Sequence, residues 1–138
     1  MKVLFLCTHN SARSQMAEAI LRKLDSDLPV SKYESFSAGT EKTLVRPLAI
    51  EAMQDWNVDM SKQYSKTLDE FLDQDIDLVV TVCDNANDTC PFFPRAKKRL
   101  HWSFPDPSKA VGTHEEQLAV YRTIRDQIAE RIKNELMV

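Results

Sequence analysis

The chain has 138 residues, of which 43% are hydrophobic and 28% are charged, and its formal net charge is −3. This length and composition fit one globular domain over residues 1–138, and the acidic balance argues against a nucleic-acid groove or a membrane-surface patch. No apolar run approaches the ~20 residues of a membrane span, and the N-terminus lacks the features of a signal peptide. We therefore expect a cytoplasmic protein, by default a monomer, whose three cysteines serve chemistry rather than a disulfide framework.

The first half of the chain alternates between the patterns of strands and helices. Residues 2–6 form a continuous apolar run, which is typical of a strand buried on both faces. Apolar side chains then recur at helical spacing over residues 15–24. A short second strand is expected over residues 33–36, followed by a turn at 37–39. Pro47 suits the first turn of the next helix.

The second half continues the same alternation. A short helix is expected over residues 67–72, and residues 76–82 form the clearest strand after the first. The basic residues 97–99 are interpreted as a turn before a fourth strand at 100–104. A long amphipathic helix is expected over residues 115–135.

The βαβ alternation predicts an α/β fold, a three-layer sandwich in which helices flank a four-stranded parallel sheet. In such sheets, ligands bind at the carboxyl ends of the strands. The four predicted strands end at or just before Cys7, Ser37, Cys83 and Asp106. We therefore expect these residues to share one rim of the sheet and to form a single active site.

The segment from Cys7 to Ser14 carries the strongest chemical signal, because it connects a strand to a helix. Its backbone amides and the helix N-terminus form an anion site, and Arg13 adds a planar fork of donors. This field favours the thiolate of Cys7, and Ser14 can donate a hydrogen bond to it. A structural cysteine near a salt-bridged arginine is the alternative, but the flanking strand and helix favour a nucleophile beneath a tetrahedral oxyanion. The residues expected to bind the oxyanion are Thr8, His9, Asn10, Ser11, Ala12 and Arg13.

Nearly the whole chain resembles the thioredoxin-coupled arsenate reductases, which share the fold of the low-molecular-weight protein tyrosine phosphatases. The residues that carry the resemblance are Cys7 to Glu18, Ser37-Ala38-Gly39, Cys83 and Cys90 with six residues between them, and Asp106-Pro107. The loop alone is typical of the superfamily. The cysteine pair points to arsenate reduction, because a phosphatase has no need of it.

The resemblance implies a mechanism. The Cys7 thiolate attacks arsenate, Asp106 protonates the departing oxygen, and a Cys7–arsenic adduct forms. Cys83 attacks Cys7 and expels arsenite, and Cys90 then attacks Cys83. Thioredoxin reduces the final Cys83–Cys90 disulfide, so the only cofactor implied is an external dithiol reductant. Phosphate or sulfate would also fit the loop.

The distance between the two resolving cysteines predicts a rearrangement. If residues 83–90 were helical, the two α-carbons would lie about 10 Å apart, whereas a disulfide needs roughly 4.4–6.8 Å. The intervening residues 84–89 are small, polar and turn-prone, so we expect this stretch to be remodelled on oxidation.

Three positions depart from the family pattern, and at one of them Ala12 stands where many members have a further cysteine. Many members have glycine where this chain has His9, a residue that tolerates a left-handed backbone. Some relatives bind potassium beneath the loop, and Asn10, Glu18 and Ser37 match three of its ligands. Lys66 stands where the fourth ligand, an aspartate, is expected. Its ammonium either replaces the cation or is an ordinary solvated group, and no other metal is expected.

Other functions and reductants remain open from the sequence. A phosphotyrosine phosphatase would share the loop, but Ser108 follows Asp106-Pro107 where phosphatases carry an aromatic residue. A redox or oxyanion sensor would not need a general acid. A zinc site formed by Cys83, Cys90 and His101 lacks the close cysteine pair of common structural sites. Glutaredoxin or a small thiol could replace thioredoxin, although a second resolving cysteine favours thioredoxin.

Overall fold

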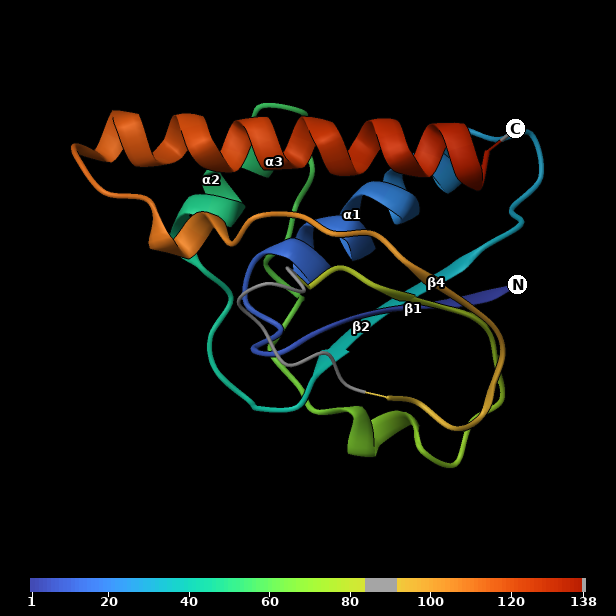
Figure 1. The fold of residues 1–138 in the computed structure, drawn as a ribbon. Coiled ribbons are helices and arrows are strands. Elements are labelled where there is room, and N and C mark those ends of the chain that lie inside the picture. The colour runs from blue at the N-terminus through green and yellow to red at the C-terminus, as the bar shows by residue number, and fades with distance from the viewer. Residues whose placement is uncertain (84–91, 138) are drawn as a thin grey trace.

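The protein folds around a parallel sheet of four strands in the order β2-β1-β3-β4 (Figure 1). The computed structural model describes residues 1–83 and 92–137. Its elements are β1 (Lys2–Cys7), α1 (Arg13–Ser26), β2 (Glu34–Gly39), α2 (Pro47–Gln54), the 3₁₀ helix η1 (Leu68–Phe71), β3 (Ile76–Thr81), β4 (Ala96–His101), the 3₁₀ helix η2 (Pro107–Lys109) and α3 (His114–Glu135). The predicted parallel α/β fold is confirmed.

The central strand β1 is buried on both faces, which explains its continuous apolar run. Val3 and Phe5 belong to the core beneath the α-helices, whereas Leu4 and Leu6 belong to a second cluster on the opposite face. Figure 1 places α1, α2 and α3 together over one face of the sheet. In the described part of the chain, the opposite face is covered by η1, whose Phe71 joins the second cluster.

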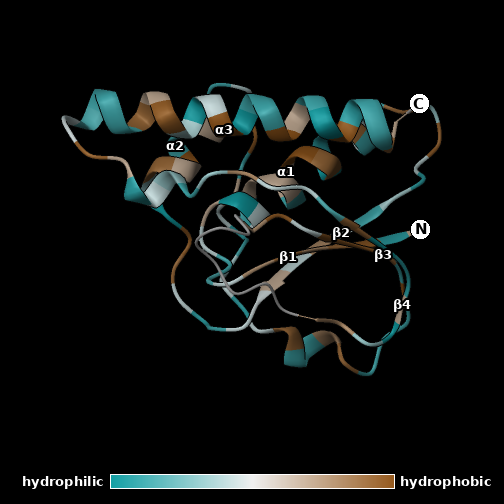
Figure 2. Ribbon diagram, viewed as in Figure 1, coloured by the Kyte–Doolittle hydropathy of each residue, from teal (hydrophilic) through white to brown (hydrophobic). Residues whose placement is uncertain are grey.

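Hydropathy follows this layering. Figure 2 shows apolar strands at the centre of the molecule and a mixed surface on α3. The α3 helix packs through Leu118, Tyr121, Ile124, Ile128 and Ile132, which lie at helical spacing. Its N-terminus carries a capping box between Thr113 and Glu116. None of the helices within residues 1–83 and 92–137 is long and apolar enough to cross a membrane.

Two predicted boundaries are wrong. The fourth strand is Ala96–His101, so residues 97–99 are strand rather than turn. Its basic side chains are tolerated because β4 lies at the edge of the sheet and exposes them. The second strand continues to Gly39, because it pairs with β1 along its whole length, and Ser37 therefore lies within the strand. The predicted remodelling of residues 84–89 lies outside the described residues.

Candidate active site

The loop between β1 and α1 places the Cys7 sulfur beneath a set of directed hydrogen bonds. Cys7 is 2% exposed, and its Sγ lies 2.9 Å from Ser14 Oγ and 3.3 Å from the Asn10 amide nitrogen that donates to it. Asn10 Nδ2 donates to Ser14 Oγ at 2.8 Å. The Ser14 hydroxyl therefore accepts from Asn10 and keeps its own proton available for the Cys7 sulfur. The predicted Ser14–Cys7 hydrogen bond is confirmed.

Asn10 organises the turn of this loop. It has a φ of 49°, so the left-handed residue of this loop is Asn10, and His9 does not need the left-handed backbone that histidine can tolerate. Asparagine suits this region because its short polar side chain bonds locally. Its Oδ1 accepts hydrogen bonds from Gln15 Nε2 at 2.8 Å and from the Lys66 amide at 2.9 Å. These bonds hold the loop to the segment that precedes η1.

The loop carbonyls point outward and are held by neighbouring segments. Thr8, His9 and Ser11 accept hydrogen bonds through their carbonyl oxygens from the Thr40 amide (2.9 Å), Thr43 Oγ1 (2.8 Å) and the Arg46 amide (2.9 Å), respectively. At the start of α1, Ala12 makes no side-chain capping bond. These bonds fix the course of the loop that leads into α1, and oxyanion binding by its amides stays a prediction.

Arg13 and Asp106 face each other across the site. Arg13 is 3% exposed, its Nη1 donates to the Phe104 carbonyl at 3.1 Å, and its Nη2 lies 3.9 Å from Asp106 Oδ2. Asp106 Oδ1 accepts hydrogen bonds from the Ser108 amide at 2.9 Å and from Ser108 Oγ at 2.7 Å. With Oδ1 occupied in this way, Oδ2 is the oxygen directed towards the arginine and the loop.

Cys83 lies next to β1, the strand that ends at Cys7. It follows β3, is completely buried, and its Sγ lies 3.9 Å from the carbonyl oxygen of Leu6, the residue before Cys7. The Val82 amide donates to the same carbonyl at 2.9 Å, which extends the register of β1 and β3 to this point. Of the four residues expected at one rim, Cys7, Cys83 and Asp106 lie at the same end of the sheet, whereas Ser37 lies within β2 and donates to Glu18. Cys90 lies outside the described residues, as does part of the zinc alternative that includes it.

A buried ion pair occupies the position where a potassium site was in question. Glu18 Oε1 accepts from Ser37 Oγ at 2.7 Å and lies 3.6 Å from Lys66 Nζ, which also donates to the Tyr64 carbonyl at 3.1 Å. Both Glu18 and Lys66 are 7% exposed, so Lys66 is not a solvated side chain. A cationic group already faces Glu18, and the residues present do not fit a potassium ion.

A hollow opens beside the loop, and its rim combines apolar and charged groups. The cavity of about 510 Å³ is lined by His9, Glu41, Thr43, Leu44, Val45, Arg46 and Pro47. His9 Nδ1 lies 3.2 Å from Glu41 Oε2.

Behind the site, burial raises the pKa of Tyr121, and the Asp106 carboxylate acts in the same direction. His101 lies exposed at the end of β4, 2.5 Å from Thr81 Oγ1.

Two supporting residues gained their roles only from the structure. Ser108 stands where phosphatases carry an aromatic residue, and here it holds Asp106 through two hydrogen bonds. A Cβ added at Gly39 would lie 2.7 Å from the Thr8 carbonyl and 2.9 Å from the Asn10 nitrogen, so only glycine allows β2 to approach the loop. The position of Gly39 at the end of a short strand could have indicated a close approach of backbone, whereas no sequence pattern predicts the contact between Ser108 and Asp106.

Comparison with known proteins agrees with this geometry. Residues 2–137 match the low molecular weight phosphotyrosine protein phosphatase family. The chain belongs to this family. Within it, the arsenate reductases of Halalkalibacterium halodurans and Bacillus subtilis are 49% and 42% identical over 131 residues, which cover 95% of this chain and 91% of each relative.

Solved structures of the family give the same picture. "An arsenate reductase in the phosphate binding state" superposes with a TM-score of 0.79 and 33% identity, covering 96% of this chain and 94% of that one. A low molecular weight protein tyrosine phosphatase from T. tengcongensis superposes with a TM-score of 0.75 at 24% identity over 99% of this chain and 98% of that one, which supports the fold alone. The chain therefore groups with the arsenate reductases of the phosphatase family.

Proposed function

We propose that the protein reduces arsenate to arsenite through a relay of three cysteines and is regenerated by thioredoxin. The observation that carries the proposal is the position of Cys83, whose buried sulfur lies 3.9 Å from the carbonyl of the residue before Cys7. A phosphatase needs only the loop and Asp106. A second buried thiol next to the nucleophile's strand supports a disulfide step.

The proposed reaction begins with arsenate in the loop, where the amides and Arg13 neutralise its charge. The Cys7 thiolate attacks arsenic(V) while Asp106 gives its proton to the departing oxygen, which leaves as water. Cys83, as a thiolate, then attacks the Cys7 sulfur. The electron pair of the broken sulfur–arsenic bond passes to arsenic, so arsenite is released as arsenic(III) and a Cys7–Cys83 disulfide forms.

Regeneration follows by thiol–disulfide exchange. Cys90 attacks Cys83 and releases the Cys7 thiolate, and the dithiol of thioredoxin supplies two electrons and two protons to the Cys83–Cys90 disulfide. A neighbour of this chain, from Corynebacterium glutamicum, is described as a thioredoxin-dependent arsenate reductase and has a TM-score of 0.64 at 27% identity, covering 96% of this chain and 60% of that one. This description supports thioredoxin as the reductant here.

A three-way comparison tests the relay. Arsenite formation with thioredoxin, thioredoxin reductase and NADPH is measured for the wild type, Cys90→Ser and Cys7→Ser, beside hydrolysis of an aryl phosphate. We expect Cys7→Ser to be inactive and Cys90→Ser to release about one arsenite per protein without turning over. Full multiple turnover by Cys90→Ser would contradict the relay, and activity on the aryl phosphate alone would assign the site to phosphate-ester hydrolysis.

We further infer that Lys66 makes the loop independent of potassium. Its ammonium faces Glu18 Oε1 at 3.6 Å, and Glu18 in turn accepts from Ser37. The KM for arsenate should be the same in potassium and sodium buffers of equal ionic strength. Lys66→Asp should restore a carboxylate set and make the KM fall when sodium is replaced by potassium. Lys62→Asp, an equal charge change at an exposed neighbour, serves as the control.

A further inference from the structure

Basic residues are concentrated at the outer edge of the sheet, although the chain as a whole is acidic. The strand β4 pairs with β3 on one side, and no strand among residues 1–83 and 92–137 pairs with its other side. Lys97, Lys98 and Arg99 are consecutive and exposed, and Arg95 precedes them. We call these four residues the basic edge.

The basic edge is only partly neutralised by the protein itself. Arg95 lies 2.8 Å from Asp75 Oδ1 and Lys97 lies 3.2 Å from Asp77 Oδ1. Within the described ranges, Lys98 and Arg99 form no ion pair. Charged residues on an edge strand also discourage edge-to-edge aggregation, but that role requires no particular surroundings. The surroundings of Arg99 are specific.

An apolar groove lies beside Arg99, one of the two basic-edge residues that form no ion pair within residues 1–83 and 92–137. It has a volume of about 270 Å³ and is lined by Val79, Thr81, Phe92, Phe93, Arg99, Leu100 and His101. The ring of Phe92 is 68% exposed and lies 4.8 Å from the Arg99 guanidinium. Arg99 is itself fixed by hydrogen bonds to the carbonyls of Phe93 and Pro94, at 2.9 and 3.1 Å. The groove therefore presents an aromatic face and a positioned cation to solvent.

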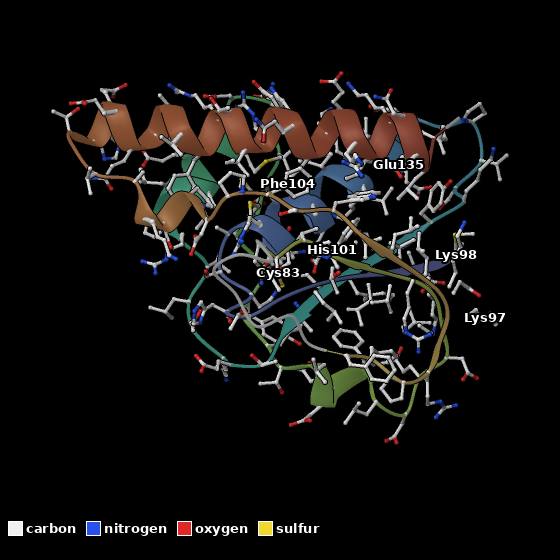
Figure 3. All side chains as sticks on the ribbon, viewed as in Figure 1. Cys83, Lys97, Lys98, His101, Phe104 and Glu135 are labelled. Carbon is white, nitrogen blue, oxygen red and sulfur yellow. The ribbon has the colours of Figure 1, made fainter. Side chains whose placement is uncertain are left out.

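The groove lies at the carboxyl ends of β3 and β4, the end of the sheet at which Cys83 follows β3. Thr81 and His101 are register partners at the ends of β3 and β4, and Cys83 follows Thr81 by two residues, a distance of about 7 Å along an extended chain. Figure 3 shows the labelled side chains of Lys97, Lys98 and His101 following β4 towards the side of the molecule where Cys83 lies. A molecule seated in the groove would thus lie beside the end of β3 that leads to Cys83, rather than over the oxyanion loop.

We propose that the basic edge and its groove dock the protein that reduces this chain, namely an acidic protein whose exposed dithiol is surrounded by apolar residues. This inference rests on the proposed function and extends it to the partner's binding surface. Lys98 and Arg99 attract the partner's carboxylates, and Phe92 packs against its apolar surround. The docked dithiol is oxidised to a disulfide while the disulfide of this chain is reduced to two thiols, with two electrons and two protons transferred.

The test compares two reductants on two variants. Arsenate turnover is measured with thioredoxin, thioredoxin reductase and NADPH, and separately with dithiothreitol, which needs no docking surface. Lys98→Glu should raise the KM for thioredoxin roughly five- to tenfold at low ionic strength, and the difference should shrink at ~0.5 M salt. Phe92→Ser should raise the same KM with little dependence on salt. The rate with dithiothreitol should be unchanged in both variants.

Lys133→Glu is the matched control, because it makes the same charge change at an exposed position in the last turn of α3. A KM for thioredoxin that is unchanged in Lys98→Glu and Phe92→Ser would overturn the docking proposal and leave arsenate reduction intact. A salt-sensitive dimer that Lys98→Glu abolishes would also overturn it, because a second copy would then occupy the edge. Loss of arsenite formation by the wild type with both reductants would instead contradict the proposed function.

Discussion

At the scale of single residues, the site depends on donors that select one oxygen or one sulfur. Ser108 gives Asp106 Oδ1 two hydrogen bonds, at 2.9 Å from its amide and 2.7 Å from its hydroxyl, and leaves Oδ2 facing Arg13. In the proposed reaction, a proton carried on Oδ2 would be directed to the oxygen that leaves arsenate. Ser108 is thus a positioning residue, because it acts through the carboxyl group of Asp106.

Replacing Ser108 tests this role. Ser108→Ala keeps the hydrogen bond from the backbone amide to Asp106 but removes the one from the hydroxyl. The Asp106 carboxyl group can then rotate, so kcat should fall roughly tenfold while the KM for arsenate changes little. Ser108→Thr should restore most of kcat, because it returns a hydroxyl to the same place. The measurement is steady-state arsenite formation for the three proteins. A rise in KM at constant kcat would show that Ser108 affects substrate binding instead.

Residue types with a chemical signature could be identified from the sequence. The spacing of Cys7, Arg13 and Ser14 between a strand and a helix was enough to predict an anion loop, and the Ser14–Cys7 contact is observed at 2.9 Å. The sequence did not identify Asn10 as the left-handed residue, because the turn depends on the groups that donate to and accept from its side chain. Those partners, Gln15 and the amide of Lys66, become visible only in three dimensions.

At the scale of elements, the approach of β2 to the loop depends on one missing side chain. Gly39 is paired with Cys7, and a Cβ there would lie 2.7 Å from the Thr8 carbonyl and 2.8 Å from the Cys7 carbonyl. These obstacles are backbone atoms, which cannot rotate away as a long side chain can. The last pair of the β1–β2 ladder and the loop geometry are therefore coupled.

Gly39→Ala should weaken both features. Because backbone must shift, we expect about 1–3 kcal/mol of lost stability and a KM for arsenate raised several-fold, since the loop amides move with Thr8 and Asn10. Urea unfolding and steady-state kinetics provide the two measurements. Gly112→Ala is the comparison: its φ of 112° makes it strained too, but its neighbour is the Glu116 side chain, so stability should fall while the KM stays unchanged. Equal KM values in both variants would contradict the coupling.

The boundaries of an element could be predicted where the burial of apolar residues sets them. They could not be predicted where hydrogen-bonded pairing with a neighbouring strand sets them. The strands β1 and β3 are buried, so their apolar runs marked them correctly. The edge strand β4 is mostly polar and has the sequence Ala-Lys-Lys-Arg-Leu-His, which resembles a turn followed by a strand. Its pairing with β3, from Ile76↔Ala96 to Thr81↔His101, sets its true limits. A ladder on one side can hold a strand that hydrophobicity alone would not predict.

At the scale of the whole molecule, the parallel sheet brings distant residues to one rim. Cys7, Cys83 and Asp106 stand far apart in sequence, and the alternation of strands and helices was sufficient to place them together. The helical cover was less predictable. All the α-helices of the described chain lie over one face, because α1, α2 and α3 share a single apolar cluster with the residues of β1 that face them.

The opposite end of the sheet is held by carboxylates, which makes stability depend on pH. Asp25, near the end of α1, accepts hydrogen bonds from Ser31 Oγ at 2.6 Å and from the amides of Lys32 and Tyr33 at 2.7 and 2.9 Å. The Ser31 bond, followed by the Lys32 amide bond, lowers the pKa of Asp25 in the folded protein. These bonds fasten the connection that leads into β2, so the charge of Asp25 supports the junction between helix and sheet.

The sign of the dependence follows from the lowered pKa. The contribution is complete above the unfolded pKa of about 3.9 and is lost as pH falls through the lower folded value. Asp25→Asn should therefore be less stable than the wild type at neutral pH, and the difference should shrink under acid, where both side chains are neutral. Urea unfolding between pH 2 and 7 measures it, with Asp73→Asn, an exposed carboxylate before β3, as the control. A difference in unfolding free energy that stays constant down to pH 2 would mean that Asp25 acts through its shape and not its charge.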